Sequence, residues 1–183
     1  MTFSHRLIVL AFLKLGEEEP FVNQLTALVS KNKFIHVELG FENSKYFSIM
    51  HGSKATLRQK KLDNPNYTVR SLKVTQDQYD ACYSICLNLN EKNIQFDNTG
   101  MFMVFFNKLC CVCAPRPTLD ETKHTFCSKI ITQVLQEIQV PEVMHLRASC
   151  TTPSDLYEAV KDSHNNVIFS TKITRPDFRL VIP

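Results

Sequence analysis

Glycine is scarce in this chain: its 183 residues contain only four. A phosphate-binding loop needs closely spaced glycines, because the backbone must approach the phosphate, and no such loop is present. No serine-centred nucleophile elbow is visible either. Repeats, low-complexity tracts and flexible linkers are also missing. We therefore expect residues 1–183 to form a single domain that needs no cofactor, since a chain of this length can bury a sizeable core.

Neither positive nor negative charge is concentrated in one part of the sequence. Lys and Arg number 21, Asp and Glu number 18, and the formal net charge is +3. Nucleic-acid binding usually requires a basic patch or stripe, so no nucleic-acid partner is expected. The short run Arg58-Gln59-Lys60-Lys61 could contact phosphates or lipid headgroups, but such runs are typical of a solvated surface.

Long hydrophobic runs are absent too. The apolar segment Leu7–Leu13 is too short to cross a bilayer, and glutamates follow it rather than a cleavage site, so it predicts a buried strand. Motifs for myristoylation and prenylation are missing, so no lipid anchor is expected, and membrane contact is not indicated. The seven cysteines show no disulfide framework, which favours reduced thiols and an intracellular, cytoplasmic location.

One cysteine lies at the predicted start of a helix. Apolar residues recur every four positions from Phe126 to Ile138, which is typical of a core-facing helix. Thr125 is expected to cap this helix and to place Cys127 in its first turn. Unpaired amides and the helix dipole favour an anion there, which lowers the thiol pKa and offers donors to an oxyanion. Cys127 is therefore a candidate nucleophile, although a buried structural cysteine is the commoner case.

A candidate base lies far upstream, on a predicted β-hairpin. Residues 33–40 alternate as a strand does, with His36 and Glu38 on one face, and residues 46–51 form a second strand that ends at His51. A thiol and its base need not be neighbours in sequence, because the fold can bring them together. We expect His36 to take the proton from Cys127.

The group that orients His36 depends on the hairpin register. A two-residue loop would place His51 directly opposite His36, where it can fix the imidazole tautomer. An odd-length loop would shift the register by one, so that Met50 lies opposite His36 and Ser48 lies on the diagonal. Glu38 is a third candidate, since it shares a strand face with His36. We predict His51 in this role, with Ser48 and Glu38 as the alternatives.

These segments resemble the permuted papain-like branch of the NlpC superfamily, which includes lecithin:retinol acyltransferase-like proteins, YiiX-type bacterial proteins and a poxviral branch. In that branch the histidine strands precede the cysteine helix, as His36–Gly40 and Ile49–His51 precede Phe126–Ser128 here. Leu7–Leu13 is similar to the preceding strand, and Thr152–Tyr157 to a helix that follows the cysteine. The resemblance implies an α+β, circularly permuted papain-like fold, in which an antiparallel sheet packs against the nucleophile-bearing helix.

The resemblance also implies a cysteine-dependent hydrolase or acyltransferase, acting on an amide, isopeptide or ester bond through a thioester acyl-enzyme. Acyltransferase members carry Asn before the cysteine and Glu-His after it, whereas Phe126 precedes Cys127 here and Ser128-Lys129 follow. This difference favours a thiol peptidase with a peptide or isopeptide substrate over an enzyme with an acyl-lipid substrate. If the chain is viral, the resemblance implies the host cytoplasm or the virion.

Two alternatives stay open. The protein could be a catalytically inactive viral structural or host-interaction protein of the same fold, which binds a partner through the aromatic stretch Ile94–Leu109. Cys110, Cys111, Cys113 and His124 could instead bind zinc, but a second closely spaced ligand pair is missing, so no metal is expected. The oligomeric state cannot be read from the sequence.

Capping signals and periodicity predict the remaining elements. Thr75 with Gln78 and Thr152 with Asp155 have the spacing of capping boxes, so helices are expected over residues 75–89 and after Thr152. A further helix is expected over residues 18–30, and strands over 67–74 and 167–169.

Overall fold

The computed structural model describes residues 5–16, 34–101, 103–104, 119 and 123–162. The helix expected over residues 18–30 and the strand expected over 167–169 lie outside these ranges. So do Cys110, Cys111 and Cys113 of the zinc alternative and most of the segment 102–109.

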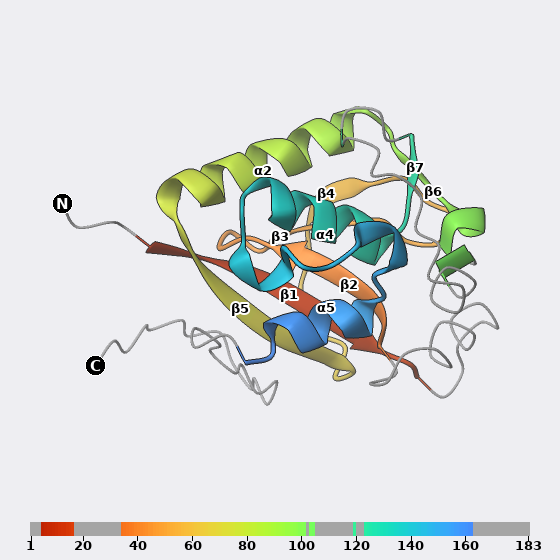
Figure 1. Ribbon diagram of the computed structural model, residues 1–183, viewed down its shortest axis with the longest axis horizontal. Helices are drawn as coiled ribbons and strands as arrows, with labels where there is room; N and C mark the ends of the chain where they lie inside the picture. Colours follow the sequence, from red (N-terminus) through yellow and green to blue (C-terminus); the bar gives the residue numbers. More distant parts are fainter. Residues whose placement is uncertain (1–4, 17–33, 102, 105–118, 120–122, 163–183) are drawn as a thin grey trace.

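Five antiparallel strands form the central sheet, in the order β4-β3-β2-β1-β5 (Figure 1). The α+β class expected from the sequence is confirmed. The strand predicted from the apolar segment near the start of the chain pairs with neighbours on both sides. Its side chains join apolar clusters on both faces of the sheet, which explains why the segment is apolar throughout. The strands are β1 (His5–Lys14), β2 (Phe34–Gly40), β3 (Lys45–Ser48), β4 (Thr56–Gln59) and β5 (Tyr67–Thr75).

Three helices cover one face of this sheet (Figure 1). Two of them begin with the predicted capping boxes: the side chains of Thr75 and Thr152 each accept a hydrogen bond from the backbone N–H three residues on. Within the described ranges, every helix is too short or too polar to cross a bilayer. The helices are α2 (Gln76–Glu91), α4 (Cys127–Glu137) and α5 (Pro153–Val160), with 3-10 turns at Pro141–Val143 and Ala148–Cys150.

The main core lies between the sheet and α4. Leu10 and Phe12 of β1 lie opposite Leu39 and Val37 of β2, so their side chains share the face toward the helices. The predicted apolar stripe of α4 is confirmed, because its residues are buried against this face. Each fully buried aliphatic side chain contributes roughly 1.5–3 kcal/mol, so the stripe fixes where the start of α4 lies on the sheet. The stripe residues are Ile130, Ile131, Val134, Leu135 and Ile138.

His36 and Glu38 belong to the opposite face of the sheet. On β1 they lie across from Leu13 and Ala11, and Leu13 in turn lies across from Tyr67 of β5. Ala11 and Tyr67 are buried in a smaller apolar cluster on this side. The site therefore combines side chains from the less covered sheet face with a helix that packs on the other face.

The turn between β2 and β3 decides the hairpin register. The N–H of Ser44 donates to the carbonyl oxygen of Phe41 at 3.1 Å, and Ser44 has a φ of 58°. This is a three-residue loop, in which a tight turn is followed by one left-handed residue. Leu39 consequently lies opposite Phe47. The register expected from a two-residue loop is therefore wrong, and the odd-length alternative is confirmed.

β3 is also shorter than the sequence predicts. It ends at Ser48, and His51 is exposed in a turn. The hydroxyl and the amide of Ser53 both donate to the carbonyl oxygen of Met50, at 2.7 and 3.0 Å, and so hold that turn. The hairpin therefore does not place His51 across from His36.

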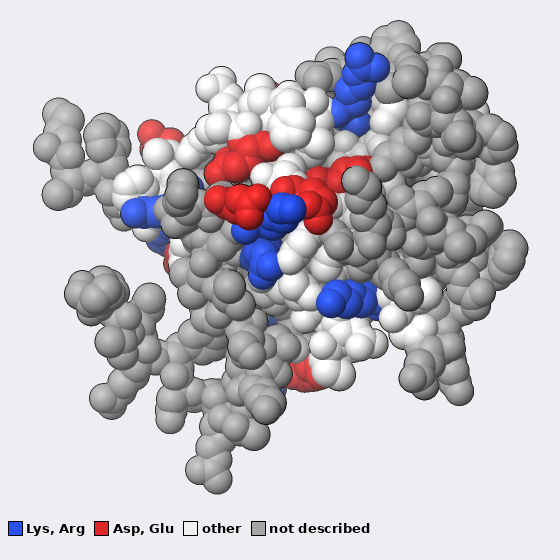
Figure 2. Space-filling model, turned by 60° about the horizontal axis from the view of Figure 1, so that its bottom comes forward, with Lys and Arg blue, Asp and Glu red and all other residues white. Residues whose placement is uncertain are grey.

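Charge is mixed on the surface as well as along the sequence. On the face shown in Figure 2, acidic and basic side chains lie next to one another. Within the basic run of residues 58–61, Arg58 and Lys61 are exposed as expected, whereas Lys60 is partly buried. The prediction of a solvated surface is therefore wrong for Lys60.

Candidate active site

Cys127, the candidate nucleophile, is the first residue of α4. The N-cap is Phe126 rather than the expected Thr125, and no side chain caps this helix. Thr125 is not available for that position because it lies in the two-residue strand β7, where it pairs with Phe96 of β6. The amides of the first turn are free of a capping side chain, and the helix dipole favours a negative charge beside Cys127.

The start of α4 meets β2 where that strand has an open edge. Pairing between β2 and β3 extends only from Gly40 to Leu39, so the earlier part of β2 is open to α4 on this side. The backbone N–H groups of Val37 and Ser128 lie near the Cys127 sulfur and lower its pKa. Both donors stabilise the thiolate more than the thiol.

The thiol of Cys127 and the imidazole of His36 lie close enough for each to shift the pKa of the other. Both residues are buried, with 7% and 8% of their surface exposed. Burial by itself raises the pKa of Cys127, but the neighbouring His36 and the two backbone donors outweigh it, so this pKa is lowered. The structure thus brings the Cys127 thiol and the His36 imidazole, which are distant in sequence, close together.

The pKa of His36 moves in the complementary direction. Burial lowers it, but the charge and hydrogen bond of Cys127, followed by those of Glu38, raise it to about 9. A base with a raised pKa beside a thiol with a lowered one favours transfer of the proton from sulfur to imidazole. Both pKa shifts therefore favour the thiolate–imidazolium form of the pair.

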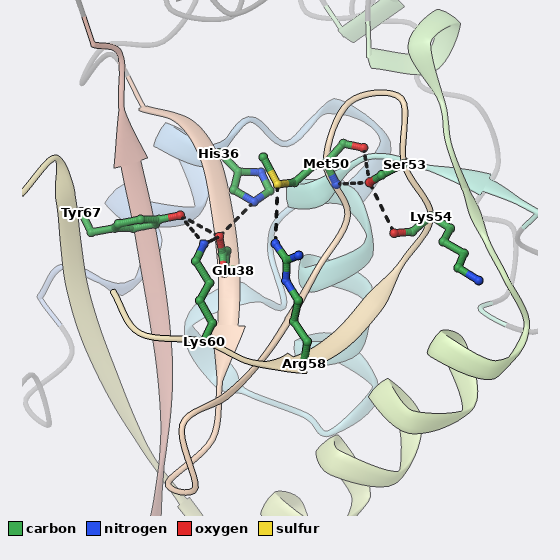
Figure 3. A network of polar contacts seen from close by, with 8 residues as sticks. All are labelled: His36, Glu38, Met50, Ser53, Lys54, Arg58, Lys60 and Tyr67. Carbon is green, nitrogen blue, oxygen red and sulfur yellow. Dashed lines mark hydrogen bonds and ion pairs between the residues drawn. The ribbon is translucent and has the colours of Figure 1, made fainter. Parts of the chain in front are cut away.

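Glu38 is the carboxylate on the other side of the imidazole. Its Oε1 lies 3.5 Å from Nε2 of His36 (Figure 3). Glu38 is 1% exposed. Burial raises its pKa, but His36, Lys60 and Tyr67 outweigh burial and lower it to about 2. Glu38 is therefore ionised, and its negative charge lies beside Nε2 of His36.

His51 and Ser48, the other two candidates for orienting His36, have different neighbours. The ring of His51 lies edge-on to Phe96, with the ring centres 5.4 Å apart. Ser48 is buried and lies across from Thr56 of β4. In the part of the chain that the structure describes, the side chains that interact with the His36 imidazole are Cys127 and Glu38. The structure thus brings Cys127 and His36 together with Glu38, the third candidate, and not with His51.

Two residues of the site were not found by sequence reasoning. Lys60 donates to Oε1 of Glu38 at 2.5 Å, and the hydroxyl of Tyr67 donates to the same oxygen at 2.7 Å (Figure 3). Lys60 also donates to the Tyr67 hydroxyl at 2.9 Å. A tyrosine at the start of a strand and a lysine in a basic run carry no local signal for this contact, because three strands must assemble before they meet.

Metal binding finds no support in the described ranges. Among those residues, no group of three or more His, Cys, Asp or Glu side chains lies close enough to hold a metal ion. His124 is exposed in β7.

The chain matches no protein-family model, and comparisons with curated proteins and with solved structures give no match either. The site must therefore be interpreted from its own geometry. A buried thiol–imidazole pair at a helix start, with a carboxylate behind the imidazole, contains the groups needed for nucleophilic attack on a carbonyl.

Proposed function

We propose that the protein is a cysteine-dependent hydrolase or acyltransferase, with Cys127 as the nucleophile, His36 as the base and Glu38 as the group that orients His36. The observation that carries the proposal is the proximity of the buried Cys127 thiol, at the first residue of α4, to the buried His36 imidazole. Glu38 replaces His51 in the orienting role, because Glu38 lies beside Nε2 of His36.

The reaction begins with transfer of the thiol proton from Cys127 to His36 and attack of the sulfur on the substrate carbonyl carbon. The backbone N–H of Cys127, at the start of α4, stabilises the negative charge on the carbonyl oxygen. His36 then gives its proton to the leaving amine or alcohol as the carbon–heteroatom bond breaks, which leaves a thioester on Cys127. Water or a second acceptor attacks the thioester carbonyl while His36 takes its proton. The carbon–sulfur bond then breaks, the acid or acylated acceptor leaves, and the proton returns to the sulfur.

Glu38 acts through His36 in this scheme. Its carboxylate, 3.5 Å from Nε2, favours the tautomer that carries the proton on Nε2, so that Nδ1 can take the thiol proton. Its charge also stabilises the imidazolium that forms. This role requires Glu38 to stay ionised, which agrees with its lowered pKa.

A peptide or isopeptide substrate fits the residues around Cys127 better than an acyl lipid does. The chain has Phe126 and Ser128-Lys129 where acyltransferase members of the resembled family have Asn and Glu-His. Ser128 is buried, and its hydroxyl donates to the carbonyl oxygen of Thr151 at 2.7 Å, so it holds the backbone and does not face a substrate. We propose a reducing compartment, since the reaction requires Cys127 to be a thiol rather than part of a disulfide.

The order of elements supports the permuted papain-like fold as part of this proposal. The histidine strand β2 precedes the cysteine helix α4, and α4 packs against β2 of an antiparallel sheet. The short capped helix α5 follows the cysteine, as in the YiiX-type and viral members that the sequence resembles.

Site-specific alkylation tests the proposed function. The protein is treated with iodoacetamide at pH 6, and the modified fraction of each cysteine is followed by peptide mass spectrometry. Cys127 should react at least about tenfold faster than Cys150, a partly exposed thiol in the same chain, because its thiolate is already present. His36→Ala should remove this advantage, and His51→Ala should leave it unchanged. Equal, slow labelling of Cys127 and Cys150 would instead support the catalytically inactive interaction protein.

A substrate screen follows once the thiolate is established. Peptide, isopeptide and ester substrates that release a fluorophore are compared with wild type and Cys127→Ser. The proposal expects a thioester on Cys127, detected as a mass increase of the acyl group that disappears with hydroxylamine.

A further inference from the structure

The carboxylate of Glu38 is held more closely by other groups than by His36. Its Oε1 accepts from Lys60 at 2.5 Å and from Tyr67 at 2.7 Å, whereas Nε2 of His36 is 3.5 Å away. Lys60 and Tyr67 also contact each other, so the three polar groups form a closed triangle. Among the described residues, the second oxygen of Glu38, Oε2, has no hydrogen-bond partner.

The groups of this triangle come from different parts of the sheet. Glu38 is on β2, Tyr67 begins β5, and Lys60 follows β4. Lys60 is additionally fixed by its own backbone, because its N–H donates to the carbonyl oxygen of Ser44 in the hairpin turn at 3.0 Å. The turn that sets the register of the hairpin therefore also sets the position of Lys60.

The geometry points to Lys60 and Tyr67 as positioning residues of the proposed active site, which keep the Glu38 carboxylate ionised and in place beside His36 throughout the reaction. The inference rests on the proposed function and extends it to two residues that do not touch the reacting atoms. This role also explains why Lys60, which belongs to a basic run, contacts the buried carboxylate of Glu38.

We call Lys60 and Tyr67 together the clamp of Glu38, and the need for this clamp follows from the reaction itself. His36 is charged before the leaving group departs and neutral afterwards, so it compensates the charge of Glu38 for only part of the cycle. A buried carboxylate without a compensating charge or donor takes up a proton. Lys60 supplies a permanent positive charge, and Tyr67 supplies a hydrogen bond to the ionised form.

Other charged or titratable groups around Glu38 do not supply this compensation. Tyr46 of β3 interacts with Glu38 through charge, and the pKa of Tyr46 is raised by burial and by that carboxylate. Arg58 of β4 acts on Tyr67 at a distance, and the contact of its guanidinium is with the sulfur of Met50 at 4.0 Å. Among the described residues, Lys60 is thus the permanently charged cation in direct contact with Glu38.

The experiment is a titration of the Glu38 side chain in the whole protein, by carbon NMR of its carboxyl group. The resonance is assigned by its absence in Glu38→Gln. In wild type we expect no titration of this carboxyl in the range where ordinary glutamates titrate. Lys60→Met should move its midpoint up by at least about one pH unit, because the charged form loses its ion pair. Lys60→Arg should restore at least half of the difference.

Two more variants separate the clamp from general charge and folding effects. Lys61→Met removes the same charge from the neighbouring exposed position and should leave the Glu38 midpoint unchanged. Tyr67→Phe keeps the ring and removes one donor, so it should raise the midpoint without a change in net charge. It also provides the test if Lys60→Met does not fold, as judged by circular dichroism.

The inference and the proposed function fail in different ways. If Lys60→Met and Lys61→Met give the same Glu38 midpoint, or if Tyr67→Phe leaves it unchanged, the clamp is contradicted while fast labelling of Cys127 would still stand. If Cys127 labels like an ordinary thiol in wild type, the proposed function is contradicted whatever the Glu38 titration shows.

Discussion

His36 and Glu38 are two positions apart on β2, so their side chains leave the same face of the strand, and their Nε2 and Oε1 atoms lie 3.5 Å apart. This pairing needs no second strand, because alternate residues of one strand are neighbours on its face. The cysteine, in contrast, reaches His36 from another layer of the molecule. The site therefore contains one local contact, between His36 and Glu38, and one long-range contact, between His36 and Cys127. The two contacts can be tested independently.

Glu38→Gln tests the local contact. The substitution keeps the size of the side chain and removes its charge, so the pKa of His36 should fall from about 9 because the imidazolium loses a negative neighbour. We expect a decrease of about one pH unit or more, measured by NMR of the His36 ring. His51→Ala is the matched control and should leave this titration unchanged. A shift in His51→Ala and none in Glu38→Gln would return the orienting role to His51.

Cys127→Ala tests the long-range contact. Burial lowers the pKa of His36, and the neighbouring thiolate of Cys127 provides the largest opposing effect. Without the sulfur, burial should prevail and the pKa of His36 should fall well below about 9. Cys150→Ala is the control for loss of a cysteine elsewhere. An unchanged His36 titration in Cys127→Ala would show that the two side chains do not interact in solution.

The stability of the fold should depend on Glu38 at acid pH. Its pKa is depressed from 4.5 to about 2, so its contribution is complete above pH 4.5 and is lost as the pH falls toward 2. The shift corresponds to about 3 kcal/mol of unfolding free energy. Glu38→Gln should flatten the fall of unfolding free energy in this range, measured by urea denaturation at a series of pH values. Glu137→Gln, at an exposed position of α4, is the matched control and should retain the wild-type dependence.

The elements that the sequence predicts correctly are those with local causes. The capping boxes at Thr75 and Thr152 involve residues three positions apart, and both are present. The position of Cys127 in the first turn of α4 is also correct, because the apolar stripe that follows requires a helix there. Thr125 is different: its pairing with Phe96 is a contact between distant segments, and it moves the helix start by one residue.

The parts that the sequence could not decide depend on loop length and strand assembly. One left-handed residue, Ser44, makes the hairpin loop three residues long and shifts the register. That shift excludes His51 from the position across from His36. The burial of Lys60 depends in addition on where β4 ends relative to β2 and β5, which no pattern within the run of residues 58–61 indicates.

The most direct test of the central claim is the pH dependence of the Cys127 thiolate, followed by the ultraviolet absorbance that wild type shows in excess of Cys127→Ser. The account predicts that this signal is already present at neutral pH and that His36→Ala moves its appearance to higher pH, since the imidazolium no longer stabilises the sulfur. A signal that appears only near the ordinary thiol pKa, and at the same pH in wild type and His36→Ala, would contradict it.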